Sequence, residues 1–230
     1  MSQPISVGMV LFPNLTQLDL TGPYEVFARL PDTTVCLVAE SRLPVRSEYG
    51  LTITPDVTFD TAPDLDVLVV PGGTGINRMM ESEPMLEFLR GRGRTAQYVT
   101  AVCTGSLLLG AAGLLKGYRA TTHWLSLELL TAFGAEPVKA RVVRDRSRIT
   151  GGGITAGMDF ALAVAAELRG EHVAKTIQLM LEYDPQPPFR AGSPECAPAD
   201  LVQKVQSLRQ SLQDDRKAIV ARAAARLKKS

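Results

Sequence analysis

The segment Gln97–Gly113, QYVTAVCTGSLLLGAAG, constrains the fold more than any other part of the chain. A run rich in Val and Thr ends at Cys103, Thr104 and Gly105 follow, and a Leu- and Ala-rich run suited to a helix comes next. This order predicts a strand, a sharp turn that carries the cysteine, and a helix. At a helix start, free N–H groups and the positive end of the dipole favour a thiolate. The segment therefore predicts a nucleophilic sulfur anion exposed at this turn.

Apolar runs alternate with helical patterns along the first 181 residues. The predicted strands are nearly continuous in apolar residues, which is typical of a parallel sheet that is buried on both faces. We therefore expect an α/β fold, with helices on both sides of a mostly parallel sheet. The strands are expected at 5–12, 34–39, 65–70, 118–122 and 141–154 (a hairpin), and a turn and helix at 15–30. Further helices are expected at 83–90, 124–133, 155–168 and 172–181, in addition to the strand and helix on either side of Cys103.

Glycines follow a second apolar strand at the point where it ends. Gly72 and Gly73 lie in PGGTG, directly after LDVLVV. Because sites in parallel sheets form beyond the carboxyl ends of strands, one crevice can hold these glycines together with Cys103. Their backbone N–H groups are then candidates for stabilising a developing negative charge. A plain turn after a strand is the alternative interpretation.

Two further polar residues lie within predicted apolar segments. Asp19 interrupts LDLTGPYEVF, either as a first-turn aspartate of the following helix or as an acid beside the thiol. His123, in ATTHW, is either the base of a Cys–His dyad or a half-buried histidine at an element boundary. The residue types alone leave both questions open.

Charge and cysteine content exclude several function classes. The net charge is +1, from 25 basic and 24 acidic residues, so electrostatics predicts neither a nucleic-acid nor a membrane partner. The three cysteines are widely spaced and form no CxxC pair, which argues against a disulfide framework and a zinc site. We expect reduced cysteines, a cytoplasmic location and no metal.

The last part of the chain has a different pattern. Leu201, Val205, Leu208 and Leu212 recur at helical spacing on an otherwise charged segment. We expect a main domain over residues 1–195 and an amphipathic helix within residues 196–230. The apolar stripe of this helix is predicted to pack on its own domain or on a dimer partner.

Three of these segments together resemble a known family. VVPGGTG, AVCTGSLLLGAAGLLKGYRATTHW and LDLTGPYEVF are similar to segments of the ThiJ/PfpI superfamily, which has the class I glutamine amidotransferase-like fold. The resemblance implies a flavodoxin-like three-layer sandwich with a nucleophile elbow. ITGGGITAGMDFAL and LEYDPQPPF extend the similarity to the isonitrile hydratase branch. That branch implies a homodimeric hydro-lyase without a cofactor, acting on a small uncharged isonitrile.

The resemblance also implies roles for individual positions. Cys103 matches the nucleophile, which would form a thioimidate that water converts to an N-substituted formamide. Asp19 matches the acid that hydrogen-bonds the thiol and donates the proton. Thr104, a further candidate catalytic position, stands where protease-like members have histidine, so peptidase activity is not expected. Ile154 matches a position that lines the site, and together with Gly72 and Gly73 it is a candidate for binding the substrate.

Other functions share these features. The same domain occurs in transcription regulators that carry an added helix-turn-helix module, although no basic recognition helix is apparent here. A redox sensor in which Cys103 is oxidised would use the same elbow. A glyoxalase-like hydrolyase is the third alternative. We expect isonitrile hydration in preference to these.

Overall fold

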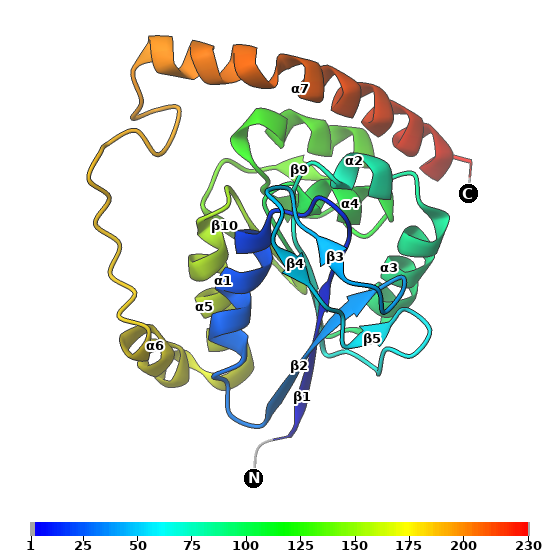
Figure 1. The fold of residues 1–230 in the computed structure, drawn as a ribbon, viewed down its shortest axis with the longest axis vertical. Helices are drawn as coiled ribbons and strands as arrows, with labels where there is room; N and C mark the ends of the chain where they lie inside the picture. The colour runs from blue at the N-terminus through cyan, green and yellow to red at the C-terminus, as the bar shows by residue number, and fades with distance from the viewer. Residues whose placement is uncertain (1–2, 230) are drawn as a thin grey trace.

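A seven-stranded sheet forms the centre of the computed structural model, which describes residues 3–229 (Figure 1). The strand order is β10-β11-β7-β6-β1-β2-β5; β10 and β11 are antiparallel, and every other neighbouring pair is parallel. The strands are β1 (Ile5–Val10), β2 (Thr33–Ala39), β5 (Val57–Thr58), β6 (Val67–Val70), β7 (Tyr98–Val102), β10 (Val142–Asp145) and β11 (Arg148–Gly151).

The inner strands have the order of a flavodoxin-like sheet. Taken in chain order, β1, β2, β6, β7 and β11 are arranged as 2-1-3-4-5. All four residues of β6, VLVV, are buried, as expected for a strand covered on both faces. After β1 the chain continues to β2 on one side of the sheet, and after β6 it continues to β7 on the other side. The strand order therefore reverses between β1 and β6, and the crevice at their carboxyl ends is the expected place for a site.

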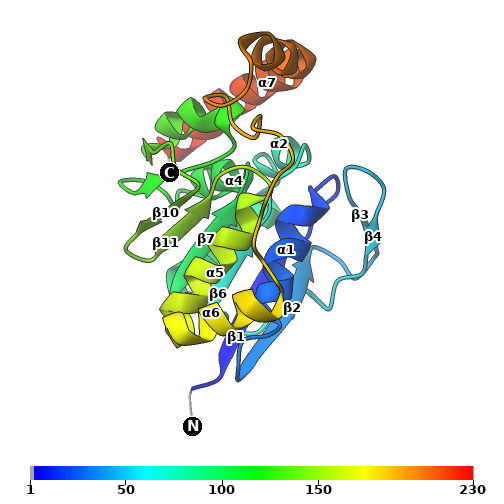
Figure 2. The same cartoon turned by 90° about the vertical axis from the view of Figure 1, so that its left-hand side faces the viewer.

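Helices cover both faces of the sheet. On one face lie α1 (Gln17–Phe27), α5 (Ala156–Arg169) and α6 (Glu171–Met180), with α1 packed on α5 and α5 on α6 (Figure 2). On the other face lie α3 (Glu83–Thr95) and α4 (Gly105–Ala111), of which α4 packs on β6 and β7. The predicted three-layer α/β sandwich is therefore confirmed.

Shorter elements surround the carboxyl ends of the parallel strands. The short helix α2 (Ile76–Met79) follows the turn after β6, and the segment predicted as a helix after His123 is the 3-10 helix η1 (Trp124–Phe133). Two small two-stranded sheets complete the fold: an antiparallel one of β3 (Val45–Arg46) and β4 (Thr52–Ile53), and a parallel one of β8 (Arg119–Ala120) and β9 (Glu136–Pro137).

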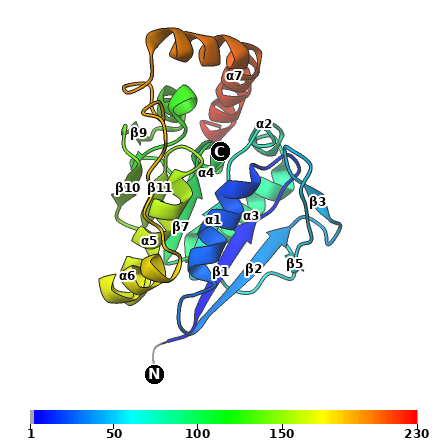
Figure 3. The same ribbon diagram turned by 60° about the vertical axis from the view of Figure 1, so that its left-hand side comes forward.

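The long C-terminal helix α7 (Ala199–Leu227) crosses this same end of the sheet, opposite the N-terminus (Figures 1 and 3). It packs on η1, α4 and α2. An exposed loop of chain along the α1–α5 side joins it to α6. None of the helices within residues 3–229 is both long enough and apolar enough to cross a bilayer.

The predicted apolar stripe of the C-terminal helix is not the face that packs on the domain. Leu208 is 74% exposed and Leu201 is also exposed, whereas Val205 and Leu212 are half-buried. The buried face lies in the second half of the helix, where small alanines allow close approach to the domain. Its members are Gln213, Arg216, Val220, Ala223 and Ala224.

Candidate active site

Cys103 lies on a sharp turn between β7 and α4, as the sequence predicts. Its φ is +54°, a value that residues other than glycine rarely adopt, so the backbone is strained at this residue. The Cys103 N–H donates to the Gly151 carbonyl at 3.1 Å, and Thr122 Oγ1 donates to the Cys103 carbonyl at 2.7 Å. A Cβ at Gly105 would lie 2.2 Å from the Val70 carbonyl oxygen, so only glycine fits there.

Asp19 places its carboxyl group beside this thiol. The residue lies in the first turn of α1 and is fully buried. Its Oδ2 accepts a hydrogen bond from the Gly72 N–H at 3.0 Å, which anchors the carboxyl group to the turn after β6. The other oxygen, Oδ1, is buried without a well-aligned hydrogen-bond partner, and the Cys103 thiol interacts with this carboxyl. Asp19 is therefore both a first-turn residue and the acid of the thiol.

Burial raises the pKa of both groups. The pKa of the Asp19 carboxyl rises from 3.8 to about 7, mainly because the carboxylate is removed from water, while the Gly72 N–H and the thiol partly oppose this. Burial, and then the charge of Asp19, raise the pKa of the Cys103 thiol well above its ordinary value. The two groups titrate as one coupled pair. Near neutral pH the pair can both supply and accept a proton.

The expected free, exposed thiolate is wrong for this structure. Cys103 is only 4% exposed. The Thr104 N–H and the Arg216 charge favour the anion, but burial and the negative carboxyl of Asp19 outweigh them. The sulfur is therefore a buried thiol beside the Asp19 carboxyl.

The two glycines hold the site together and do not present free donors. The Gly72 N–H is donated to Asp19, and the Gly73 N–H is donated to Thr104 Oγ1 at 3.0 Å. A Cβ at Gly72 would lie 2.7 Å from Thr104 Oγ1 and 2.9 Å from Asp19 Oδ2. Because both N–H groups are occupied, this structure does not support the predicted oxyanion site at these glycines. They position the acid and the hydroxyl of Thr104, whose Oγ1 also lies 3.3 Å from the Gly73 carbonyl oxygen.

His123 caps η1 and makes no hydrogen bond to Cys103 in the described chain. Its Nδ1 accepts from the Leu125 N–H at 3.3 Å. Burial, followed by the nearby charges of Arg216 and Arg209, lowers the pKa of the imidazole to about 4. The ring is therefore neutral at physiological pH, and this geometry favours a structural cap over the base of a dyad.

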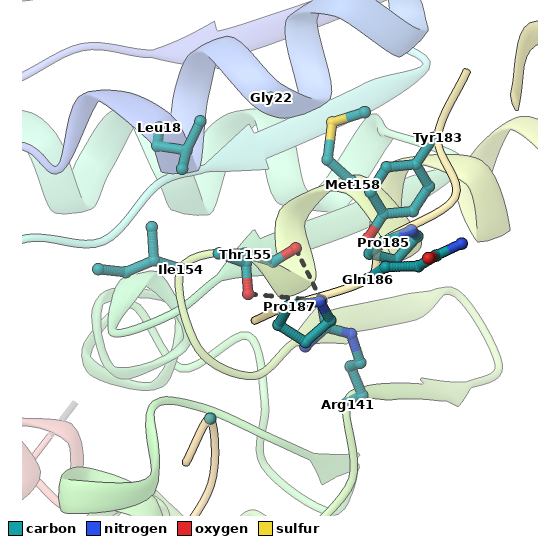
Figure 4. A pocket seen from close by; sticks show the side chains of 11 residues that line it. Leu18, Gly22, Arg141, Ile154, Thr155, Met158, Tyr183, Pro185, Gln186 and Pro187 are labelled. Carbon is teal, nitrogen blue, oxygen red and sulfur yellow. Dashed lines mark hydrogen bonds between the residues drawn. The ribbon is translucent and has the colours of Figure 1, made fainter. Parts of the chain in front are cut away.

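A pocket of about 710 Å³ lies between α1, α5 and the loop that follows α6 (Figure 4). Leu18 precedes Asp19 in the chain, and Ile154 follows the glycines after β11; both line the pocket, whereas Asp19 and Cys103 do not. Most of the surface is apolar, and Arg141 reaches the Thr155 carbonyl at 3.0 Å along one wall. The lining residues are Leu18, Gly22, Arg141, Ile154, Thr155, Met158, Tyr183, Pro185, Gln186, Pro187 and Gly192.

The structure adds three residues that the sequence analysis did not identify. Thr122 supports the elbow carbonyl. Glu48, in the hairpin between β3 and β4, raises the pKa of Asp19, and Arg216 of α7 favours the Cys103 anion. The sequence offers one signal for Arg216: its helical spacing places this charged residue on the same face of the helix as Val220 and Ala223.

This chain is similar to several known proteins over most of its length. A family model described as the DJ-1/PfpI family matches residues 5–167. An isonitrile hydratase of Pseudomonas putida is 53% identical over 97% of this chain and 98% of its own length. A crystal structure of a ThiJ/PfpI family protein from Pseudomonas syringae, 47% identical, superposes with a TM-score of 0.93 and covers 95% of this chain and 91% of that one.

A transcription regulator is also similar, but over only part of its length. The HTH-type transcriptional regulator GbdR of Pseudomonas aeruginosa is 34% identical over 79% of this chain and 51% of its own sequence. About half of the regulator therefore has no counterpart in the match.

Proposed function

This chain belongs to the DJ-1/PfpI family, and we propose that it hydrates isonitriles to N-substituted formamides, as a hydro-lyase. The observation that carries the proposal is the pair formed by the strained Cys103 elbow and the buried Asp19 carboxyl. This pair combines a nucleophile with an acid whose pKa is near 7. Such a pKa suits a group that must give and take a proton at neutral pH.

The first step forms a covalent thioimidate. An isonitrile, R–N≡C, has a terminal carbon that is protonated by the Asp19 carboxyl and becomes electron-poor. The sulfur of Cys103 adds to that carbon, and the thiol proton passes to the Asp19 carboxylate. One C–H bond and one C–S bond form, the N≡C bond becomes N=C, and the carboxyl group regains its proton.

The second step releases the product. The protonated Asp19 carboxyl gives its proton to the thioimidate nitrogen, and it takes a proton from water as the water oxygen adds to the thioimidate carbon. The C–S bond then breaks, and the sulfur leaves as the thiol with the proton of the added hydroxyl. The sum of the two steps is R–N≡C plus water to R–NH–CHO, with Cys103 and Asp19 restored.

We propose that the pocket lined by Leu18 and Ile154 receives the substituent of an uncharged substrate. This pocket is mainly apolar, and apolar walls favour a neutral alkyl or aryl group over an ion. We propose that Ile154, on the edge of this pocket, contacts the substituent on the isonitrile nitrogen. Thr104, held by Gly73, fixes the turn that carries the sulfur.

Formamide production from an alkyl isonitrile tests the proposal. Cys103→Ala should abolish turnover, and Asp19→Asn should lower kcat by about 100-fold or more. Cys196→Ala is the matched control, because Cys196 is exposed in the loop before α7 and should be dispensable. Because the acid form of Asp19 starts the reaction, kcat/KM should fall as the pH rises through about 7. Turnover by Cys103→Ala would contradict the proposal.

We also propose that the protein acts as a homodimer in the cytoplasm. The exposed Leu201 and Leu208 on α7 offer a surface for a second copy. Cys103 must stay reduced to act as a nucleophile, which favours a reducing compartment. Sedimentation of a species of monomer mass at micromolar concentration would contradict the dimer.

A further inference from the structure

Arg216 is a buried positive charge that the two-residue mechanism leaves unused. It lies on α7 and is only 3% exposed. Its Nε donates to Asn77 Oδ1 at 2.9 Å, and its Nη1 donates to Ser126 Oγ at 3.1 Å. Both hydrogen-bond partners are neutral; the charge of Glu48 acts on the guanidinium, but no carboxylate in the described part of the chain lies within salt-bridge distance of it. Burying an unpaired guanidinium costs free energy, so its position calls for a physical reason.

The two partners of Arg216 connect it to two walls of the thiol site. Asn77 is in α2, directly after the turn whose Gly72 and Gly73 hold Asp19 and Thr104. Ser126 is in η1, and its N–H donates to the His123 carbonyl at 2.8 Å. His123 follows Thr122, whose hydroxyl holds the Cys103 carbonyl. Arg216 therefore bridges the two segments that flank the elbow. The helix that carries it, α7, crosses this end of the sheet (Figure 3).

The other charged groups around the sulfur do not supply this positive charge. Asp19 of α1 and Glu48 of the β3–β4 hairpin are acidic, and His123 of η1 is neutral near pH 7. Arg209, also on α7, is paired with Glu48 at 3.8 Å. Arg216 is thus the buried cation that acts on this site, among the described groups, and it forms no salt bridge, although the charge of Glu48 also reaches it.

We propose that Arg216 stabilises the anionic sulfur of Cys103 during turnover, so that the C-terminal helix is a functional part of the site. When Asp19 takes the thiol proton, the sulfur becomes negative in a place with little water, where a nearby fixed cation has a large effect. The mutual influence of the Arg216 and Cys103 charges on their pKa values supports their proximity. Only the consequence for turnover rests on the proposed hydratase function.

The test is the pH dependence of Cys103 alkylation by iodoacetamide, followed on the Cys103 peptide by mass spectrometry. The rate reports the thiolate fraction without any isonitrile, so it is independent of the hydration assay. The exposed Cys196 is the internal reference in each sample. Arg216→Gln should move the midpoint of the profile upward by about one pH unit and slow the reaction roughly tenfold at pH 8. Arg216→Lys should restore most of the rate.

Arg222→Gln is the matched control. Arg222 lies on the same helix and ties it to the turn after α2 through Glu81 at 2.8 Å, but it is exposed. Its replacement weakens the attachment of α7 without removing the buried charge. An unchanged midpoint in Arg216→Gln, or equal changes in Arg216→Gln and Arg222→Gln, would overturn the proposal in favour of a purely structural arginine.

A second variant keeps the test decisive if Arg216→Gln fails to fold. Asn77→Asp preserves the size of the partner and the acceptor for Nε, and it gives the guanidinium a carboxylate. The charge of Arg216 is then neutralised in place, while a structural role would be maintained or strengthened. We expect Cys103 alkylation to slow and its midpoint to rise. A variant that folds and shows the wild-type profile would refute the inference.

Discussion

Asp19→Asn should stabilise the protein while it removes the acid of the site. The buried carboxyl has a pKa of about 7 in the folded protein, against 3.8 for the ordinary group. The folded state therefore binds more protons than the unfolded state between these values, and the contribution of Asp19 to stability is lost as the pH rises from about 4 to 7. Above pH 7 the stabilising contribution of Asp19 is fully lost, and the difference no longer changes with pH.

The magnitude follows from the same linkage. One pH unit of difference corresponds to about 1.4 kcal/mol, so the free energy of unfolding of the Asn variant relative to the wild type should increase by roughly 3 kcal/mol between pH 5 and pH 8. The Asn side chain can retain the acceptor for the Gly72 N–H, so the main contact of the carboxyl is preserved. The variant gains stability because no charge has to be buried.

Urea unfolding followed by the fluorescence of Trp124, the single tryptophan, measures this difference at each pH. Asp66→Asn is the control for a general effect of the substitution, because Asp66 also accepts a backbone N–H bond, from Ser6 at 2.8 Å, but is only partly buried. A stability difference that is the same at pH 5 and pH 8, or an Asp19→Asn variant that is less stable at pH 8, would refute the reasoning.

Three further variants test other parts of the site. Gly105→Ala should cost about 3 kcal/mol or more in unfolding free energy, or prevent folding, because its Cβ would meet the Val70 carbonyl; Gly91→Ala, which has open space around it, should not. Thr104→Val should cost about 1–3 kcal/mol by urea unfolding, because the buried Gly73 N–H loses its acceptor, and Thr104→Ser should recover most of it. His123→Asn should keep kcat within about tenfold, because a neutral capping histidine is not the base; a loss of about 100-fold would show that it is.

Local patterns in the sequence were sufficient to predict the layers of the fold. Buried strands such as 67–70 are short apolar runs that end at glycines, and α/β sheets bring all their carboxyl ends to one edge. This rule is also why Gly72, Gly73 and Cys103 could be grouped in advance, although they are far apart in the chain, whereas Asp19 joined the group only through the family resemblance. The 3-10 geometry of η1 was not predictable from its apolar pattern.

Other features depend on the assembled structure. The thiolate prediction considered the helix end but not the burial of the sulfur and of Asp19, which dominates the pKa of both groups. The predicted donors of Gly72 and Gly73 are occupied by side chains that only the folded chain brings near. Arg216 is more than a hundred residues from Cys103 in the chain, so no local pattern connects the two. The leucines in the first half of the helix form the stronger apolar pattern, and the alanine-rich face that packs on the domain was therefore not predicted.

Detection of the covalent intermediate tests the central claim most directly. The protein is mixed with an alkyl isonitrile, quenched with acid within the first turnovers, digested and analysed by mass spectrometry. The account predicts that the Cys103 peptide gains the full mass of the isonitrile, that the adduct disappears as formamide accumulates, and that Cys36 and Cys196 remain unmodified. Formamide production without an adduct on Cys103, or at an undiminished rate in Cys103→Ala, would contradict it.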